Sequence, residues 1–179
     1  MMHEREGALL IRRMEEQDAQ AFTDGEIAQG WHADIAKYLT RLSDQAAGKC
    51  VSLTALWDGQ PAGYVNVYWT CRSGPFAGQG IPVIVDFGVL EKYRRRGIGS
   101  RLMDAAERIA AERSDRVCLG VGLHSGYGSA QRLYVKRGYV PDGSGVWYRD
   151  RPGVPYGEVV NDDDLVLFLL KPLPGRDAP

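Results

Sequence analysis

The chain has 179 residues, of which 44% are hydrophobic, and a formal net charge of −1 at pH 7. This size and composition suffice for one domain with a buried core, and the near-neutral charge argues against nucleic acid or an anionic membrane as a partner. The longest apolar run, from Leu165 to Leu170, is too short to span a bilayer, so we expect no membrane partner.

The cysteines and the N-terminus bear on cellular location. Cys50, Cys71 and Cys118 are odd in number and lack C-x-x-C spacing, which favours reduced thiols and no metal site. The first residues, MMHEREGALLIRR, do not have the pattern of a signal peptide. We therefore expect a cytoplasmic protein that forms one domain over residues 1–179, with a loose tail from about residue 172.

Local patterns predict alternating strands and helices in the first half of the chain. Apolar and β-branched runs predict strands over 8–12, 51–57 and 62–69. The Asp58-Gly59 pair predicts a hairpin turn between the last two of these strands. Segment 13–27 is polar and helical at best, whereas apolar spacing predicts an amphipathic helix over 33–47. The Gly-rich segment 70–80 is predicted to be a loop.

The second half continues this alternation. Strands are predicted over 81–89, 116–123, 146–148 and 165–171. Helices are predicted over 98–112 and from an N-cap at Ser129 to Gly138, with a turn at 141–143 and a long loop over 149–161. Because a helix joins strands 81–89 and 116–123, this pair should be parallel. The order predicts an α/β domain with a mixed, mostly antiparallel sheet, a central parallel strand pair and flanking helices.

In the stretch from Ile81 to Glu112, a strand is followed by a run of basic residues and two glycines at the start of a helix. Asp86 and Gly88 interrupt its apolar strand, and a glycine in a strand indicates a bulge or a close approach to the backbone. The basic run 92–96 then precedes Gly97 at the start of a helix, where acidic residues are normally favoured. A bound anion would resolve this mismatch, since helix N–H groups and basic side chains would point at one negative group. The alternative is a solvated basic turn.

Two common anion-binding motifs do not fit this junction. No Lys-Ser or Lys-Thr follows Gly99, as a P-loop requires, and Leu102 stands where a dinucleotide-binding loop has its third glycine. The pattern Arg-x-x-Gly-x-Gly from Arg94 to Gly99, after a bulged strand, instead resembles the acyl-CoA pyrophosphate loop of the GNAT superfamily of N-acyltransferases. A second segment, AQRLYVKRGY from Ala130, resembles that superfamily's A-x-x-L-Y-x-x-x-G-F motif.

The resemblance covers nearly the whole chain and implies acetyl-CoA as co-substrate. It places the thioester carbonyl at the Val89 backbone N–H and the pyrophosphate at the loop before the helix. Many members carry an asparagine that reaches the pantetheine arm at the position of Tyr127, so Tyr127 or Ser129 would replace it here. The implied cofactor-binding residues are Phe87, Gly88, Val89, Arg94, Arg95, Arg96, Gly97, Ile98, Gly99, Ser100, Tyr127 and Ser129.

The resemblance also implies catalytic roles. Tyr134 occupies the position of the general acid that protonates the departing thiolate, although its spacing also fits a core aromatic residue. The incoming amine must lose a proton, because an alkylammonium has a pKa of about 10. Asp86, an acid within an apolar strand, is the first candidate base, His124 the second and Glu91 the third.

The implied activity is transfer of an acetyl group to a primary amine by direct attack in a ternary complex. A small-molecule acceptor is our first expectation, with loop 149–161 closing over it. The alternatives are a protein or peptide amine, or a non-catalytic acyl-CoA sensor. A nucleic-acid role for the basic run 92–96 is disfavoured by the overall charge. The acceptor and acyl chain length stay open, and a homodimer is a further expectation.

Overall fold

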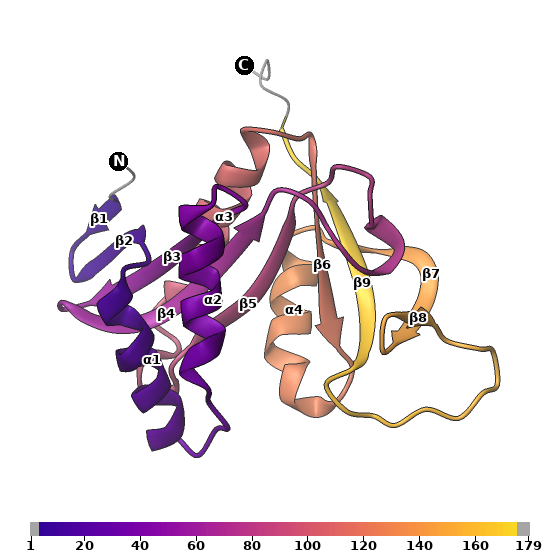
Figure 1. The fold of residues 1–179 in the computed structure, drawn as a ribbon, viewed down its shortest axis with the longest axis horizontal. Coiled ribbons are helices and arrows are strands. Elements are labelled where there is room, and N and C mark those ends of the chain that lie inside the picture. Colours follow the sequence, from indigo (N-terminus) through magenta and orange to yellow (C-terminus); the bar gives the residue numbers. More distant parts are fainter. Residues whose placement is uncertain (1–3, 175–179) are drawn as a thin grey trace. The chain divides into compact units, whose positions relative to one another are not determined.

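The structure is a computed structural model that describes residues 4–174, so the last five residues of the predicted loose tail lie outside the described part. Figure 1 shows the course of the chain. The chain forms two compact units, one from residues 4–68 and 85–109 and the other from residues 69–84 and 110–174. Each unit is therefore assembled from two separate segments of the sequence.

The elements of the described chain follow the predicted order. The strands are β1 (Glu4–Glu6), β2 (Leu9–Arg13), β3 (Cys50–Trp57), β4 (Gln60–Tyr68), β5 (Val83–Val89), β6 (Arg116–Gly122), β7 (Val140–Tyr148), β8 (Arg151–Pro152) and β9 (Leu165–Pro172). The helices are α1 (Glu16–Ala28), α2 (Ile35–Ala46), α3 (Ile98–Ala111) and α4 (Gly128–Lys136), with short 3-10 turns η1 (Gly74–Phe76), η2 (Glu91–Tyr93) and η3 (Ser125–Tyr127).

Strand pairing confirms the predicted α/β class with a mixed sheet. The first unit has the strand order β1-β2-β3-β4-β5, and the second has β5-β6-β9-β7-β8, with β5 contributing residues to both. The β1–β2, β2–β3, β3–β4, β6–β9, β7–β8 and β7–β9 pairs are antiparallel. The first residues of β5, Val83 and Ile84, pair in parallel with Cys118 and Leu119 of β6, as expected from the intervening helix.

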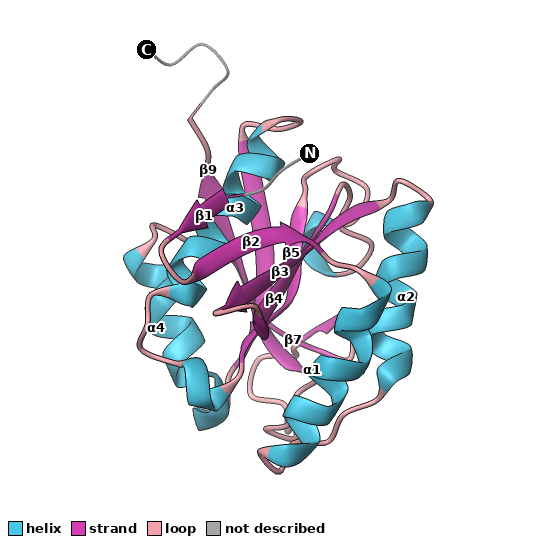
Figure 2. Ribbon diagram, turned by 90° about the vertical axis from the view of Figure 1, so that its left-hand side faces the viewer, coloured by secondary structure: helices cyan, strands magenta, loops and turns pink. Residues whose placement is uncertain are grey.

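In the first unit, α1 and α2 cover one face of the strands and α3 covers the other (Figure 2). The apolar stripe of α3 is buried, with Leu102 and Met103 both at 0% exposure, as its 3.6-residue period predicts. On the opposite face, Phe22, Tyr38 and Tyr64 join α1, α2 and β4 through ring contacts with centroids 5.0 to 5.6 Å apart. Aromatic groups at such separations add to the free energy of hydrophobic burial.

A buried ion pair anchors the start of α1. The Arg12 guanidinium at the end of β2 donates to both oxygens of Asp18, at 2.6 and 2.8 Å. The same carboxylate accepts the Glu15 backbone N–H and the Thr54 hydroxyl, each at 2.9 Å. Because four donors converge on it, the charge of Asp18 is compensated at 2% exposure.

Farther along α1, Gly25 allows the helix to approach the first-unit end of β5. A Cβ at Gly25 would lie 2.8 Å from Cδ1 of Leu90, closer than side-chain carbons normally pack. A glycine in a helix interior costs about 1 kcal/mol relative to alanine. Close packing against Leu90 explains why residue 25 is a glycine.

The structure departs from the predicted elements in several places. β1 was not predicted, although Gly7, at φ +57°, provides the turn that joins it to β2. α4 begins one residue before Ser129, with Tyr127 as its N-cap, so Ser129 does not cap it. The predicted turn at 141–143 lies within β7, where the register with β9 shifts between Pro141 and Val146. The predicted loop 149–161 includes the short strand β8.

Cys50, Cys71 and Cys118 are buried and none of them is in a disulfide. No helix within residues 4–174 has both the length and the apolar character needed to cross a membrane.

Candidate active site

β5 is irregular at Asp86, two residues before the glycine at which the sequence suggested a bulge. Asp86 has φ +48°, in the left-handed region that residues other than glycine seldom occupy. The side-chain amide of Asn66 in β4 donates to the backbone oxygens of Val85 and Asp86, at 3.2 and 3.4 Å. Asn66 thus satisfies carbonyl groups at the irregularity and helps to fix the course of the backbone that follows, Phe87 to Val89.

The backbone at Gly88 is packed closely from β4. A Cβ at Gly88 would lie 2.8 Å from Cζ of Tyr64 and 2.9 Å from its hydroxyl oxygen. A Cβ at Gly63 would lie 2.8 Å from the Gly88 carbonyl oxygen. Gly88 is therefore required by close approach and not by a positive φ angle. The Tyr64 hydroxyl lies beside the backbone that the sequence resemblance assigns to the acyl group.

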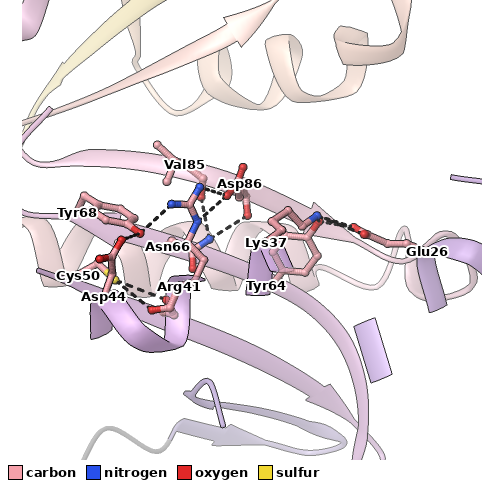
Figure 3. Close-up of polar contacts among 11 residues, drawn as sticks. Glu26, Lys37, Arg41, Asp44, Cys50, Tyr64, Asn66, Tyr68, Val85 and Asp86 are labelled. Carbon is pink, nitrogen blue, oxygen red and sulfur yellow. Dashed lines mark hydrogen bonds and ion pairs between the residues drawn. The ribbon is translucent and has the colours of Figure 1, made fainter. Parts of the chain in front are cut away.

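Asp86, the first candidate base, is held by Arg41 of α2. Arg41 Nε donates to Asp86 Oδ2 at 2.8 Å and Nη2 donates to the same oxygen at 2.5 Å (Figure 3). Arg41 Nη1 also donates to the Tyr68 hydroxyl at 2.8 Å, and that hydroxyl donates to Asp44 at 2.8 Å. Burial and then the bond to Asp44 raise the pKa of Tyr68. The Asp86 side chain is 32% exposed, so solvent reaches this chain of contacts.

A second polar cluster on the same face surrounds Glu26 of α1. Glu26 is 2% exposed, and its Oε1 accepts the Tyr64 hydroxyl at 2.5 Å. Lys37 Nζ lies 3.2 Å from each carboxylate oxygen and 3.2 Å from the Tyr64 hydroxyl oxygen (Figure 3). Glu26, Lys37 and Tyr64 were not among the residues predicted from the sequence.

Residue spacing carried a signal that could have identified both clusters. One face of β4 presents side chains with polar tips at alternate positions, namely Tyr64, Asn66 and Tyr68. One stripe of α2 presents charged side chains at helical spacing, namely Lys37, Arg41 and Asp44. A polar stripe on a helix is usually attributed to solvent, but here it contacts β4 and β5.

The predicted anion-binding turn leads directly into α3. Arg95 and Gly97 have φ +61° and +77°, and left-handed residues in a turn are typical of backbone concavities that bind anions. The Gly97 carbonyl accepts the Arg101 N–H at 3.1 Å, which starts the helix. Gly99 lets the first turn of α3 approach β5, because a Cβ there would lie 3.1 Å from Cζ of Phe87. The turn thus has the left-handed residues and the adjoining helix start that the predicted anion-binding role requires.

The arginines of this turn are exposed, and two of them lie over aromatic rings. The Arg94 guanidinium lies 5.5 Å from the Trp31 ring centroid, and Arg96 lies 5.2 Å from that of Trp57. Arg94 also pairs with Glu91, the third candidate base, at 3.3 Å. These contacts keep the guanidinium groups near the start of α3, where they add positive charge.

We expect Gly97→Ala to weaken acetyl-CoA binding about tenfold. A Cβ at Gly97 would meet no atom within 4 Å, so the cost is backbone strain at φ +77°, about 1–2 kcal/mol. Relief of that strain would turn N–H groups of the loop away from the pyrophosphate. Gly48→Ala is the matched control, since Gly48 has φ +70° and equal space but follows α2. Equal calorimetric dissociation constants for the two variants would contradict the assignment of the loop.

Ile98, which is buried, and Ser100, which is exposed, lie in the first turn of α3. The predicted residues His124, Tyr127, Ser129 and Tyr134 lie in the second unit. His124 Nε2 lies 2.9 Å from Asp163 Oδ1, and His124 Nδ1 accepts the Gly126 N–H at 3.1 Å. The Tyr127 hydroxyl donates to the same Asp163 oxygen at 2.9 Å. The bond from His124, followed by that from Tyr127, lowers the pKa of Asp163. Both ring nitrogens of His124 are engaged, so a proton-accepting role would require release of one contact.

Tyr134 lies on the buried side of α4, whereas Ser129 in its first turn is exposed. Tyr134 is 6% exposed, and its ring centroid lies 5.8 Å from that of Tyr139. Burial, with a smaller contribution from Tyr127, raises the pKa of Tyr134, so the phenol stays protonated at neutral pH. Within residues 4–174 no three His, Cys, Asp or Glu side chains converge as a metal site would require.

Comparison with known proteins identifies the family. The model of the acetyltransferase (GNAT) family matches residues 11–139. The chain belongs to the GNAT acetyltransferase family. Its members are acyltransferases, and acetyl-CoA is the co-substrate. No curated protein sequence matches the chain.

Solved structures of GNAT proteins share the fold. Ard1 from Thermoplasma volcanium is 20% identical, with a TM-score of 0.67, and the match covers 93% of this chain and 98% of Ard1. The acetyltransferase yncA from Salmonella typhimurium, solved with its cofactor acetyl-CoA, is 18% identical with a TM-score of 0.66 over 97% and 98% of the two chains. An acetyltransferase from Salmonella typhimurium that modifies the N-terminal serine of ribosomal protein L7/L12 is 12% identical, with a TM-score of 0.69 over 94% and 97%.

Proposed function

We propose that the protein transfers an acetyl group from acetyl-CoA to a primary amine of a small molecule by direct attack in a ternary complex. The observation that carries this proposal is the turn before α3, where left-handed Arg95 and Gly97 and three consecutive arginines precede a helix N-terminus. That combination suits the pyrophosphate of acetyl-CoA. In this proposal, residues of the chain bind the pyrophosphate by charge, polarise the thioester, take a proton from the amine and give a proton to the thiolate.

Each step has a proposed residue. The Val89 backbone N–H polarises the thioester carbonyl and stabilises the negative charge that develops on its oxygen. Asp86 takes the proton of the acceptor amine directly or through water, with Arg41 holding the carboxylate through Oδ2. Tyr134 gives its phenolic proton to the departing thiolate. Tyr127 and Ser129 are proposed to contact the pantetheine arm.

A peptide amine is the second candidate acceptor. Among structures with the same fold, one protein modifies the N-terminal serine of ribosomal protein L7/L12, and another is a ribosomal-protein-S18-alanine N-acetyltransferase from Escherichia coli. The fold is therefore compatible with macromolecular acceptors, and acceptor size has to be measured directly.

The test is thiol release from acetyl-CoA in the presence of alkylamines, amino acids, polyamines and short peptides with free N-termini. We expect release that depends on a small amine, with peptides slower. Faster release with peptides would establish the second candidate. Tight calorimetric binding of acetyl-CoA without amine-dependent release would indicate an acyl-CoA sensor, and absence of binding would refute the assignment of residues 94–100.

We also propose that the two units work as one domain, since the family match over residues 11–139 includes segments of both. A cytoplasmic location and pairing into a homodimer stay predictions. Sedimentation velocity of the purified chain measures the second of these directly.

A further inference from the structure

Glu26 is a buried carboxylate for which the reaction described above has no role. It is 2% exposed, in a helix that could have presented an apolar residue to β4. Burial of a carboxylate is unfavourable unless other groups compensate it. Lys37 and Tyr64 supply that compensation through contacts of 3.2 and 2.5 Å. The chain thus maintains a carboxylate, an ammonium and a phenol in mutual contact.

Tyr64 connects this carboxylate to the backbone of β5. Its hydroxyl oxygen lies 2.9 Å from the position of a Cβ on Gly88, next to the proposed oxyanion donor Val89. The same hydroxyl donates to Glu26 Oε1. One side of the phenol therefore faces the buried carboxylate, and its ring edge faces the backbone assigned to the acyl group.

We propose that Tyr64 and Glu26 form a proton relay that deprotonates the acceptor amine. The acceptor enters as an alkylammonium; one of its N–H bonds breaks and the proton passes to the Tyr64 oxygen, which frees the electron pair of the nitrogen to form the bond to the thioester carbon. In the same step the Tyr64 O–H bond breaks and that proton passes to a Glu26 oxygen. Glu26 ends protonated and Tyr64 ends neutral, so charge and protons balance. Glu26 returns its proton to water after the product leaves.

The surroundings of the pair suit a relay better than a phenolate base. Burial and then the bond to Glu26 raise the pKa of Tyr64, so the phenol does not lose its proton without receiving another. The charged and titratable groups facing the pair are Lys37 and Tyr38 of α2 and Asp86 of β5. The Lys37 side chain is 33% exposed, which gives the cluster a route to solvent.

This inference rests on the proposed transferase function, and it names a different route for the proton that Asp86 would otherwise take. The deciding variant is Tyr64→Phe, because it removes one hydroxyl while keeping the ring on Gly88 and the Glu26–Lys37 pair. Tyr38→Phe is the matched control, since Tyr38 is a buried tyrosine of the same cluster whose ring contacts Phe22 and Tyr64. Glu26→Gln is the companion variant, and its thermal midpoint shows whether it folds.

The experiment measures kcat/KM from pH 7 to 9.5 with the alkylamine that gives the fastest thiol release from the wild type. At pH 7 we expect Tyr64→Phe to be slower by about 10²-fold. The deficit should shrink as pH rises, since the free fraction of an amine with a pKa of about 10 then grows about tenfold per unit. Tyr38→Phe should stay within about threefold of the wild type.

The outcomes separate the relay from the transferase function. A loss in Tyr64→Phe that is the same factor at every pH, or that Tyr38→Phe reproduces, would show a structural role and overturn the relay. Unchanged activity in Tyr64→Phe beside an active wild type would overturn the relay alone. A wild type with no amine-dependent release would overturn both the relay and the transferase function on which it rests.

Discussion

Tyr134→Phe is expected to lower kcat about 10²- to 10³-fold, in the lower half of the range for general acid catalysis. The thiolate of coenzyme A is a fairly stable leaving group, with a conjugate acid pKa of about 8.5, so protonation assists departure without being indispensable. Burial raises the pKa of Tyr134 and keeps its proton in place through neutral pH. Apolar surroundings would likewise raise the proton affinity of a thiolate beside it.

The measurement is steady-state thiol release together with calorimetric binding of acetyl-CoA. The dissociation constant should stay close to that of the wild type, because phenylalanine retains the ring. Tyr139→Phe is the control, since Tyr139 is 1% exposed and its ring neighbours that of Tyr134. If both variants lost activity equally, the Tyr134 hydroxyl would have no specific role as the acid.

The second large effect concerns stability. Asp18→Ala is expected to lower the free energy of unfolding by about 3–5 kcal/mol, because it leaves the Arg12 guanidinium buried without its carboxylate. The Arg12 side chain is 8% exposed and that of Asp18 is 2% exposed, so water cannot replace the lost partner. The Glu15 N–H and the Thr54 hydroxyl would lose their acceptor at the same time.

Urea unfolding of Asp18→Ala beside Asp164→Ala tests this expectation. Asp164 pairs with Arg149 at 3.4 Å, but the two side chains are 58% and 67% exposed. An ion pair of that kind contributes at most about 1 kcal/mol. Comparable losses in the two variants would mean that the Arg12–Asp18 pair does not anchor α1.

Apolar periodicity predicted most of the fold because the pattern and the burial agree along these segments. Ile98, Leu102 and Ile109 recur at helical spacing and are all buried in α3. The parallel pairing of β5 with β6 followed from the helix that joins them. Arg94 to Gly99 places charge and glycine at a helix start, where acids are normally favoured, and the anion-binding role inferred from this pattern stays a prediction.

The buried polar contacts of α1, including those of the proposed relay, could not be predicted from the sequence, for one physical reason. The inward face of α1 carries Asp18, Thr23 and Glu26, all buried and each bonded to a specific partner. Because polar residues occupy this buried face, apolar residues do not recur at helical spacing, and the sequence pattern indicates a polar segment. Thr23 donates to the Ala19 carbonyl one turn earlier in the helix, whereas Asp18 and Glu26 have partners distant in sequence, Thr54 and Tyr64, which a local pattern does not show. The same holds for the Asp86 irregularity, which Asn66 supports from another strand.

The discontinuous composition of the two units constrains how the chain can be made and divided. The first unit contains residues 85–109, so synthesis must pass through residues 69–84 of the second before the first is complete. Neither unit corresponds to a contiguous gene fragment, and a truncation after Tyr68 would remove α3 and most of β5 from the first unit. During synthesis, β5 and α3 can join the first unit only after the preceding 70–80 loop has left the ribosome.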